Sequence, residues 1–226
     1  FILLNFAGKL NDVSTMMHEF GHGIHGRAAR GQTQFTFHSA LPMAETASIL
    51  CPNKTVLIPD LEAGCSLAAT INVEQLREWK KKNSGAVVVS YINTTAEVKA
   101  ESDYCCTSSN AIKIIEAIPK NREILFLPDL FLGAYLEEKT GRRLHIWPGE
   151  CHVHSKLNPA LIENLKIEKP EAEVLIHPEC GCMTNLLYLK TKNKTSNFKS
   201  EILSTNEMIK YVKKSPPPGH NNFMNF

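Results

Sequence analysis

The sequence of this 226-residue chain lacks several features that would narrow its function. Its 25 lysines and arginines are almost balanced by 23 aspartates and glutamates, so no excess of positive charge indicates binding to nucleic acid. No apolar run is long enough to cross a membrane, and no signal-peptide pattern opens the chain. We therefore expect a cytoplasmic protein whose partners are neither nucleic acids nor membranes.

Cysteine, in contrast, is present seven times, which is an odd number. In a chain with no secretory signal, such residues are expected to be reduced thiols and metal ligands rather than disulfides. A single cysteine in an α/β core is most often a small buried hydrophobic residue, and we interpret Cys105 and Cys106 in this way. The other cysteines are Cys51, Cys65, Cys151, Cys180 and Cys182.

From residue 55 onward, short runs of β-branched and aliphatic residues alternate with amphipathic stretches. The short runs predict strands at 56–58, 86–90, 124–127, 144–147 and 174–176. The amphipathic stretches predict helices at 73–82, 109–117, 129–139, 159–166 and 183–190. Strands and helices that alternate at this spacing are typical of parallel βαβ units, so the predicted fold class is α/β. An N-terminal helical segment is predicted at 13–30, where apolar residues recur every three or four positions.

Residues with reactive or polar side chains follow these predicted strands. In open α/β sheets, ligands bind at the carboxyl ends of the strands. The repeated coincidence favours a ligand site there over a set of scattered core residues. The residues concerned are Cys65, Tyr91, Asn93, Asp129, Cys151, His154, His177 and Glu179.

Seven segments of the chain match one enzyme family in the family's order. They are MAETA with IL at 43–50, KTVLIPDLEAGCSL at 54–67, VSYINTTAEVKA at 89–100, CTSSNA at 106–111, FLPDLFLG at 126–133, WPGECHVH at 147–154 and HPEC at 177–180. Over about 43–215, the chain resembles quinolinate synthase. The resemblance implies an enzyme of NAD biosynthesis that condenses iminoaspartate with dihydroxyacetone phosphate to form quinolinate. It also implies L-aspartate oxidase or aspartate dehydrogenase as the upstream source of iminoaspartate.

The resemblance further implies a fold and a cofactor. The family is built from three similar α/β domains around one [4Fe–4S] cluster, so one domain is expected to be complete here and two partial. Cys65 and Cys151 match two of the three family ligands, while the third family ligand lies beyond the end of this sequence. Cys180 and Cys182 are not in the ligand position, although their Cys-x-Cys spacing would let one of them substitute. Three thiolate ligands leave one iron open as a Lewis acid.

The same resemblance assigns roles to other residues. Tyr91, His177 and Glu179 match catalytic positions, and Glu179 is the candidate acid or base. Ser108 is expected at a helix N-terminus, where the helix dipole favours anions. The sequence departs from the family after Ser204-Thr205, because a glycine is expected there and is absent. The substrate-binding positions are matched by Tyr91, Asn93, Ser108, His154, His177, Glu179 and Thr205.

The N-terminal segment belongs to a different pattern. His18, Glu19 and His22 form HExxH on a predicted helix, so both imidazoles lie on one face and can chelate zinc, with Glu19 as base. HEFGHGIHG followed by FHSALPMAETAS resembles the oligoendopeptidase F branch of the thimet-type metallopeptidases, which implies Glu45 as the third zinc ligand. The alternative function is therefore a zinc-dependent oligopeptidase. The non-functional interpretation is an amphipathic helix with two surface histidines.

The two resemblances meet at MAETA, residues 43–47. Our hypothesis is a chimera, with a metallopeptidase-like helical fragment at 1–42, a quinolinate synthase-like α/β region at 43–215 and an unstructured tail at 216–226. Each part lacks segments on which its family depends, and the residues that hydrogen-bond to metal ligands are needed to fix the ligands' geometry. We therefore expect little or no activity of either kind from this chain alone. The third hypothesis is an inactive fragment that binds anions or nothing.

Overall fold

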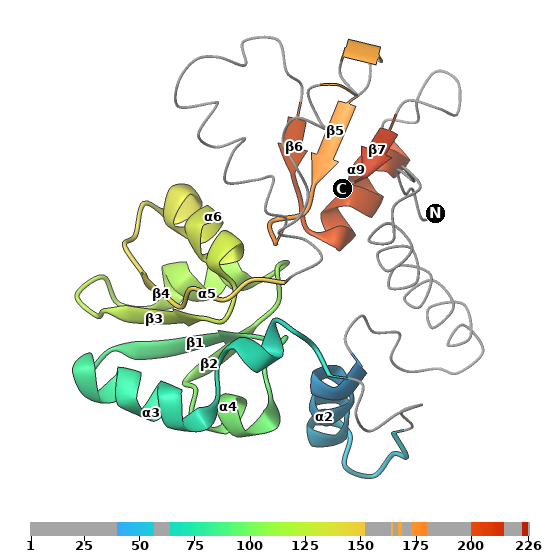
Figure 1. Cartoon of the computed structure of the whole chain (residues 1–226). Helices are drawn as coiled ribbons and strands as arrows, with labels where there is room; N and C mark the ends of the chain where they lie inside the picture. The colour runs from blue at the N-terminus through green and yellow to red at the C-terminus, as the bar shows by residue number, and fades with distance from the viewer. Residues whose placement is uncertain are drawn as a thin grey trace. The chain divides into compact units, whose positions relative to one another are not determined.

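Figure 1 shows the computed structural model of the chain, which describes residues 40–56, 64–151, 164, 167–168, 173–179, 200–214 and 223–225. The chain divides into two units, residues 1–65 and 66–226. The described part of the first unit contains helix α2 (Ala40–Leu50), which buries Ala47 and exposes Ile49 and Leu50 at its end. The helix predicted at 13–30 lies outside the described residues.

The second unit contains a parallel four-stranded sheet in the order β2-β1-β3-β4. The 3-10 helix η2 (Ala68–Thr70) precedes this sheet in the chain. Two helices cover each face of the sheet, α3 and α4 on one side and α5 and α6 on the other (Figure 1). The bounds are α3 Val73–Lys82, β1 Val87–Tyr91, α4 Ala96–Ala100, β2 Tyr104–Cys106, α5 Ala111–Ala117, β3 Ile124–Leu127, α6 Leu130–Thr140 and β4 His145–Ile146.

The two central strands are buried along their whole length. Their sequences, VVVSY in β1 and ILFL in β3, are almost continuously apolar. This composition is typical of parallel strands that are covered on both faces. The core beside them contains Ile71, Leu76, Val88, Val98, Leu125 and Leu127, with Trp79 and Trp147 packed against it.

The helices α3, α4 and α6 each begin at a residue whose side chain caps them. Asn72 and Gln75 form a capping box at the start of α3. The Asp129 carboxylate accepts a hydrogen bond from the Leu132 backbone N–H at 2.6 Å and caps α6. Gly141 ends α6 at φ +65°, a left-handed conformation that favours glycine. The bounds of α3 and α6 are therefore set by residues close to them in sequence.

A second parallel sheet in the same unit has the order β6-β5-β7. Its strands are β5 (Glu173–Ile176), β6 (Ser200–Ile202) and β7 (Phe223–Asn225), and helix α9 (Thr205–Lys214) lies between β6 and β7 in the chain. The hydroxyl of Tyr211 on α9 donates a hydrogen bond to the Glu173 carboxylate at 2.8 Å. This bond ties α9 to the central strand of the sheet.

The predicted α/β class and the parallel pairing are confirmed. The strands predicted at 86–90, 124–127, 144–147 and 174–176 and the helices at 73–82, 109–117 and 129–139 agree with β1, β3, β4, β5, α3, α5 and α6 within a few residues. The helices predicted at 159–166 and 183–190 lie outside the described residues, apart from Asn164.

Three differences from the sequence expectations stand out. Val56 is in no strand, and the rest of that predicted strand lies outside the described residues. The segment 223–225 was expected to be part of an unstructured tail, but it forms β7 because its backbone pairs with β5. Among the described residues, the structure also contains elements that the sequence pattern did not predict, namely α2, η2, α4, β2, β6 and α9.

Candidate functional site

The candidate site lies at the carboxyl ends of the parallel strands. Tyr91 is the last residue of β1 and is in register with Cys106, the last residue of β2. Asp129 follows β3 and pairs with Gly149 beyond β4 through an isolated parallel bridge. Because all strands of this sheet are parallel, these residues lie at one edge, where ligands bind in open α/β sheets.

Tyr91 and Glu179 form the buried centre of this site. Tyr91 is 6% exposed and Glu179 is 7% exposed, and the two side chains are hydrogen-bonded. Burial raises the pKa of Tyr91 well above its usual value, and the charge and hydrogen bond of Glu179 raise it further. The phenol therefore stays protonated and donates a hydrogen bond to the Glu179 carboxylate.

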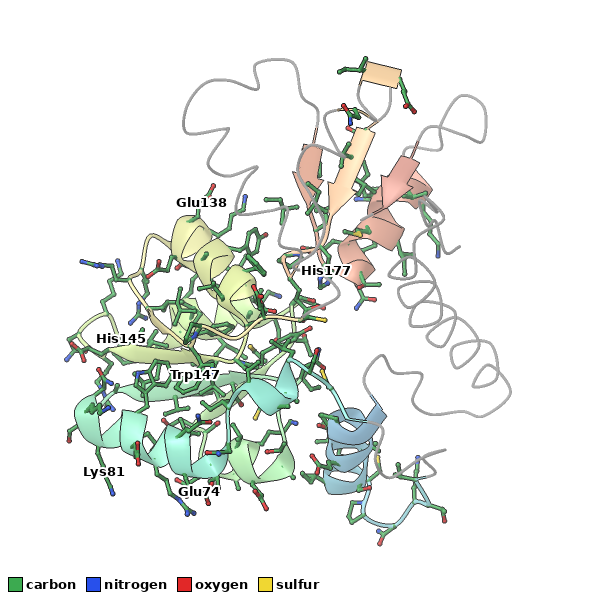
Figure 2. The ribbon with its side chains drawn as sticks, viewed as in Figure 1. Glu74, Lys81, Glu138, His145, Trp147 and His177 are labelled. Atoms are coloured by element: carbon green, nitrogen blue, oxygen red, sulfur yellow. The ribbon has the colours of Figure 1, made fainter. Side chains whose placement is uncertain are left out.

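His177 continues this chain of contacts from the end of β5 (Figure 2). Its Nδ1 lies 3.2 Å from Oε2 of Glu179 and 3.4 Å from the Glu179 backbone nitrogen. A protonated Nδ1 donates to the carboxylate, whereas a deprotonated Nδ1 accepts from the backbone N–H. His177, Glu179 and Tyr91 thus form a linked set of proton donors and acceptors, of the kind used in general acid–base catalysis.

The family resemblance assigned no role to two residues that lie beside this set. Cys106 is buried, and burial is the main reason that its pKa is raised, with the charges of Cys105 and Glu179 contributing. Asp129 is fully buried, and its charge also raises the pKa of Tyr91. The interpretation of Cys106 as a small buried residue is confirmed, but that of Cys105 is wrong, because Cys105 is exposed.

Asn93 lies in the loop that follows β1 and is half-buried. Thr94, the next residue, is fully buried and its hydroxyl donates to the Tyr91 carbonyl at 3.0 Å. The ammonium group of Lys99 on α4 donates to the Thr94 carbonyl. These contacts hold the short segment that carries Tyr91 and Asn93 in a fixed turn at the sheet edge.

Ser108 and Thr205 lie near helix starts, and neither is buried. Ser108 was expected at a helix N-terminus, but α5 begins at Ala111 with Asn110 as its cap, so Ser108 belongs to the preceding turn. Thr205 is the first residue of α9 and is exposed. Its neighbour Ser204 donates a hydrogen bond to the Glu207 carboxylate at 2.6 Å. His154 lies outside the described residues.

The candidate cluster ligands Cys65 and Cys151 are both described as thiols outside any disulfide. Cys151 is 8% exposed and Cys65 is half-buried. Thiols are the correct donors for an iron–sulfur cluster. Within the described ranges, however, no three His, Cys, Asp or Glu side chains gather in a set that could hold a metal ion. A complete ligand set would therefore need a residue from outside those ranges.

Most residues of the zinc site expected from HExxH lie outside the part of the chain that the structure describes. His18, Glu19 and His22 lie outside the described residues. Glu45 lies on α2 and is half-buried. The three histidine and glutamate positions therefore remain predictions, and Glu45 is the only one of the expected zinc ligands with a described helical position.

Among the described residues, no helix combines the length and apolarity required to cross a bilayer.

Comparison with known families gives two matches. A family described as "Quinolinate synthetase A protein" matches residues 30–221. A family described as "Peptidase family M3" matches residues 1–55. The two matched ranges overlap around α2, where the two sequence resemblances meet.

Curated relatives give a consistent result. Quinolinate synthase from Mycobacterium sp. (strain KMS) is 54% identical over 174 residues, which is 76% of this chain and 52% of the relative. The enzyme of that name from Pyrobaculum aerophilum is 55% identical over 175 residues, covering 77% of this chain and 56% of the relative. That from Mycobacterium tuberculosis (strain H37Rv) is 54% identical over 168 residues, covering 74% and 48% respectively.

The chain thus spans about half the length of the curated relatives that it matches. The family match, in contrast, covers most of this chain, from residue 30 to residue 221. It includes the sheet β2-β1-β3-β4, the strands β5 and β6 of the second sheet, and the His177–Glu179–Tyr91 set. From residue 30 onward, the chain belongs to the quinolinate synthase family.

Proposed function

We propose that this chain carries the central part of a quinolinate synthase active site. The reaction condenses iminoaspartate with dihydroxyacetone phosphate, with loss of water and phosphate and closure of a pyridine ring. The observation that supports this proposal best is the buried, hydrogen-bonded pair of Tyr91 and Glu179, with His177 Nδ1 3.2 Å from the same carboxylate. Condensation and dehydration both require groups that hold and move protons.

Each member of the set is suited to one part of this chemistry. Glu179 is placed to accept or return a proton, because its carboxylate is already in contact with two donors. Tyr91 stays a neutral donor, since burial raises its pKa. His177, which is less buried, exchanges protons between Glu179 and the surroundings. Asn93, Ser108, His154 and Thr205 are proposed to bind the carboxylate, carbonyl and phosphate groups of the substrates.

We also propose that Cys65 and Cys151 are ligands of a [4Fe–4S] cluster, completed by a ligand from outside the described residues. Such a cluster would supply an open iron as a Lewis acid. L-aspartate oxidase or aspartate dehydrogenase would supply iminoaspartate. These assignments rest on the family membership of the chain and on the thiol chemistry of the two cysteines.

The first test is the metal content of the purified chain. After anaerobic reconstitution, iron and sulfide are expected at about four each per chain, the stoichiometry of a [4Fe–4S] cluster. The double variant Cys65→Ala/Cys151→Ala should lose both, whereas Cys105→Ala, which removes an exposed thiol, should keep them. Retention of iron and sulfide by the double variant would contradict the ligand assignment.

Binding of dihydroxyacetone phosphate, measured by calorimetry, tests the substrate site separately. Wild-type chain is expected to bind it, and Ser108→Ala should weaken binding about tenfold by loss of one hydrogen bond to a charged ligand. Glu138→Gln, an exposed substitution on α6, is the matched control and should change nothing. Quinolinate formation by wild-type chain and its loss in Glu179→Gln would establish the reaction. Absence of binding would contradict the proposal.

A second candidate function is favoured by the peptidase match at residues 1–55. In that case, zinc at about one per chain without iron would be expected, with peptide cleavage that a chelator abolishes. Glu19→Gln should remove cleavage and leave zinc bound, because Glu19 is the proposed base and not a ligand. Glu45→Ala should instead lower the zinc content. Zinc retained in full by Glu45→Ala would exclude Glu45 as a ligand.

A further inference from the structure

The loop that carries Cys151 is held by several contacts with neighbouring segments. Trp147 donates its backbone N–H to the Phe126 carbonyl at 2.9 Å, which continues the pairing of β3 with β4. Two residues later, the Gly149 carbonyl accepts a hydrogen bond from the Leu130 backbone N–H at 2.8 Å. The loop between β4 and Cys151 is therefore attached to the start of α6 as well as to β3.

The side chain of Trp147 adds an attachment to a distant segment (Figure 2). Its indole N–H donates to the Thr70 carbonyl at 3.1 Å. Its ring packs edge-to-face on Trp79 of α3, with ring centroids 5.5 Å apart. Thr70 ends the 3-10 helix η2, and its hydroxyl donates to the Leu67 carbonyl at 2.7 Å, so this anchor is itself held in place.

Gly149 closes the arrangement from the other side. A Cβ at this position would collide with the Pro128 carbonyl oxygen and with the Thr70 hydroxyl. The first of these is backbone and cannot move aside as a flexible side chain can. Gly149 is buried, and only glycine allows the loop to approach Thr70 and Pro128 so closely.

We infer that Thr70, Trp147 and Gly149 form a latch that positions the Cys151 thiol at the carboxyl edge of the sheet. Cys151 stands two residues after Gly149, and Thr70 stands five residues after Cys65 in the sequence. The segments that carry the two candidate cluster ligands are therefore each adjacent in sequence to one side of the latch. The functional meaning of the latch rests on the proposed ligand role of Cys151. The existence of the latch rests only on the contacts of Thr70, Trp147 and Gly149 and does not depend on that role.

The test is site-resolved alkylation of the metal-free chain by N-ethylmaleimide under native conditions, read by peptide mass spectrometry. Cys106, which is 2% exposed in the same sheet, is the internal reference. Trp147→Phe keeps an aromatic ring but removes the indole N–H. Loss of one hydrogen bond should raise the alkylation rate of Cys151 about fivefold relative to Cys106. Gly149→Ala should produce a larger increase, because the loop must move.

Matched controls separate the latch from general loss of stability. Trp79→Phe changes the other member of the aromatic pair and leaves the bond from Trp147 to Thr70 in place. Gly141→Ala introduces strain at a left-handed residue in open space. Both should leave the ratio of the two alkylation rates unchanged. If Trp147→Phe accelerates Cys151 and Cys106 equally, or leaves both unchanged, the latch is refuted.

The alkylation experiment needs neither iron nor substrate, so the latch and the proposed function fail independently. A selective increase at Cys151 in Trp147→Phe, together with the expected iron and sulfide content in the wild type, supports both. A selective increase at Cys151 in a chain that never binds iron supports the latch and contradicts the ligand role. Where Gly149→Ala does not fold, Trp147→Phe alone decides, because it is the milder change.

Discussion

The two sheets of the second unit differ in how their structure is specified. In the sheet β2-β1-β3-β4, the central strands are wholly buried, and the helices α3, α4 and α6 are capped by side chains close to them in sequence. In the sheet β6-β5-β7, the outer strands contain three residues each, and β5 pairs with them across long stretches of chain. The first sheet is defined locally and the second by long-range pairing.

This difference matters because the candidate site draws on both sheets. Tyr91 comes from the locally defined sheet, whereas His177 and Glu179 follow the central strand of the other. The hydrogen bond between Tyr91 and Glu179 therefore joins a well-specified element to one that depends on distant partners. Perturbing the second sheet should then disturb the site even where the first sheet remains intact.

The largest expected effect comes from matched core truncations in the two sheets. Leu125 in β3 and Leu175 in β5 are both fully buried, so Leu→Ala at either position should cost about 2–5 kcal/mol of unfolding free energy. Both tryptophans, Trp79 and Trp147, pack against the first core, so their fluorescence reports the first sheet. If the two sheets unfold as one unit, Leu175→Ala will lower the midpoint of the fluorescence transition in denaturant.

The circular dichroism transition of the same variants provides the control. Leu125→Ala should shift both signals together, whichever way the sheets are coupled. A fluorescence midpoint that Leu175→Ala leaves unchanged, beside a shifted circular dichroism transition, would show that the two sheets unfold separately. In that case the Tyr91–Glu179 contact contributes too little free energy to couple them.

Helix caps provide the next comparison. Asp129 is fully buried and caps α6 at 2.6 Å, so Asp129→Ala should cost about 2 kcal/mol, at the upper end of measured caps. Ser204 is also buried, and its hydroxyl and backbone N–H both donate to the Glu207 carboxylate at the start of α9, so Ser204→Ala should cost about 1 kcal/mol by loss of the hydroxyl bond. Thermal unfolding of each variant measures the two costs.

Conservative replacements test the hydrogen bond at both positions and, at Asp129, separate its effect from that of the charge. Asp129→Asn keeps a side-chain oxygen that can accept from Leu132, and Ser204→Thr keeps the hydroxyl, so both should retain most of the stability. If Asp129→Asn is as unstable as Asp129→Ala, the charge of Asp129 rather than its capping bond is what stabilises the sheet edge.

The same contrast explains which parts of the fold could be predicted from sequence. The bounds of α3 and β3 agree with the prediction because their signals are local, a capping residue before an amphipathic run and an uninterrupted apolar run. β6 and β7 were missed because three residues, SEI and FMN, contain too few positions for a period-two pattern. Their strand conformation depends on pairing with β5, which sequence spacing does not reveal.

Some missed features did leave a signal in the sequence. Ser204 and Glu207 form S-x-x-E directly before an amphipathic run, which is the pattern of a capping box, and it predicts α9. Asp129 likewise precedes the apolar run of α6 and is a typical N-cap residue.

The contact between Tyr91 and Glu179 is different. Family resemblance named both residues, but only the folded chain brings the ends of β1 and β5 together.

The fall in unfolding free energy at alkaline pH should report on the two sheets individually, because each is associated with a tyrosine whose pKa is raised. Burial raises the pKa of Tyr91 above its usual value, and the hydrogen bond to Glu173 raises the pKa of Tyr211 to about 12. Above pH ~10 the unfolded chain loses these protons while the folded chain keeps them, so stability falls as pH rises. Each such group steepens the decline by up to about 1.4 kcal/mol per pH unit.

Tyrosine-to-phenylalanine variants test this assignment. Tyr91→Phe should flatten the decline in unfolding free energy between pH 10 and 12 more than Tyr211→Phe, because Tyr91 is buried beside Glu179 and Asp129 and Tyr211 is less buried. Urea titrations across this range provide the slopes. Equal flattening by the two variants would mean that the environment of Tyr91 is no less polar than that of Tyr211.

The smallest effect is expected at the surface of the first sheet, where Glu101 contacts Arg77 at 2.8 Å and Lys80 at 3.0 Å. The hydrogen bond from Lys80, followed by that from Arg77, lowers the pKa of Glu101, so any stabilisation is present at neutral pH and lost as pH falls through the acid range. Because the carboxylate is partly exposed to solvent and its partners are exposed, Glu101→Gln should change thermal stability only slightly, and less still at high salt. Glu78→Gln, exposed on the same helix as Arg77, is the control. A large, salt-independent loss in Glu101→Gln would show that even this locally specified sheet depends on a surface contact between α3 and the end of α4.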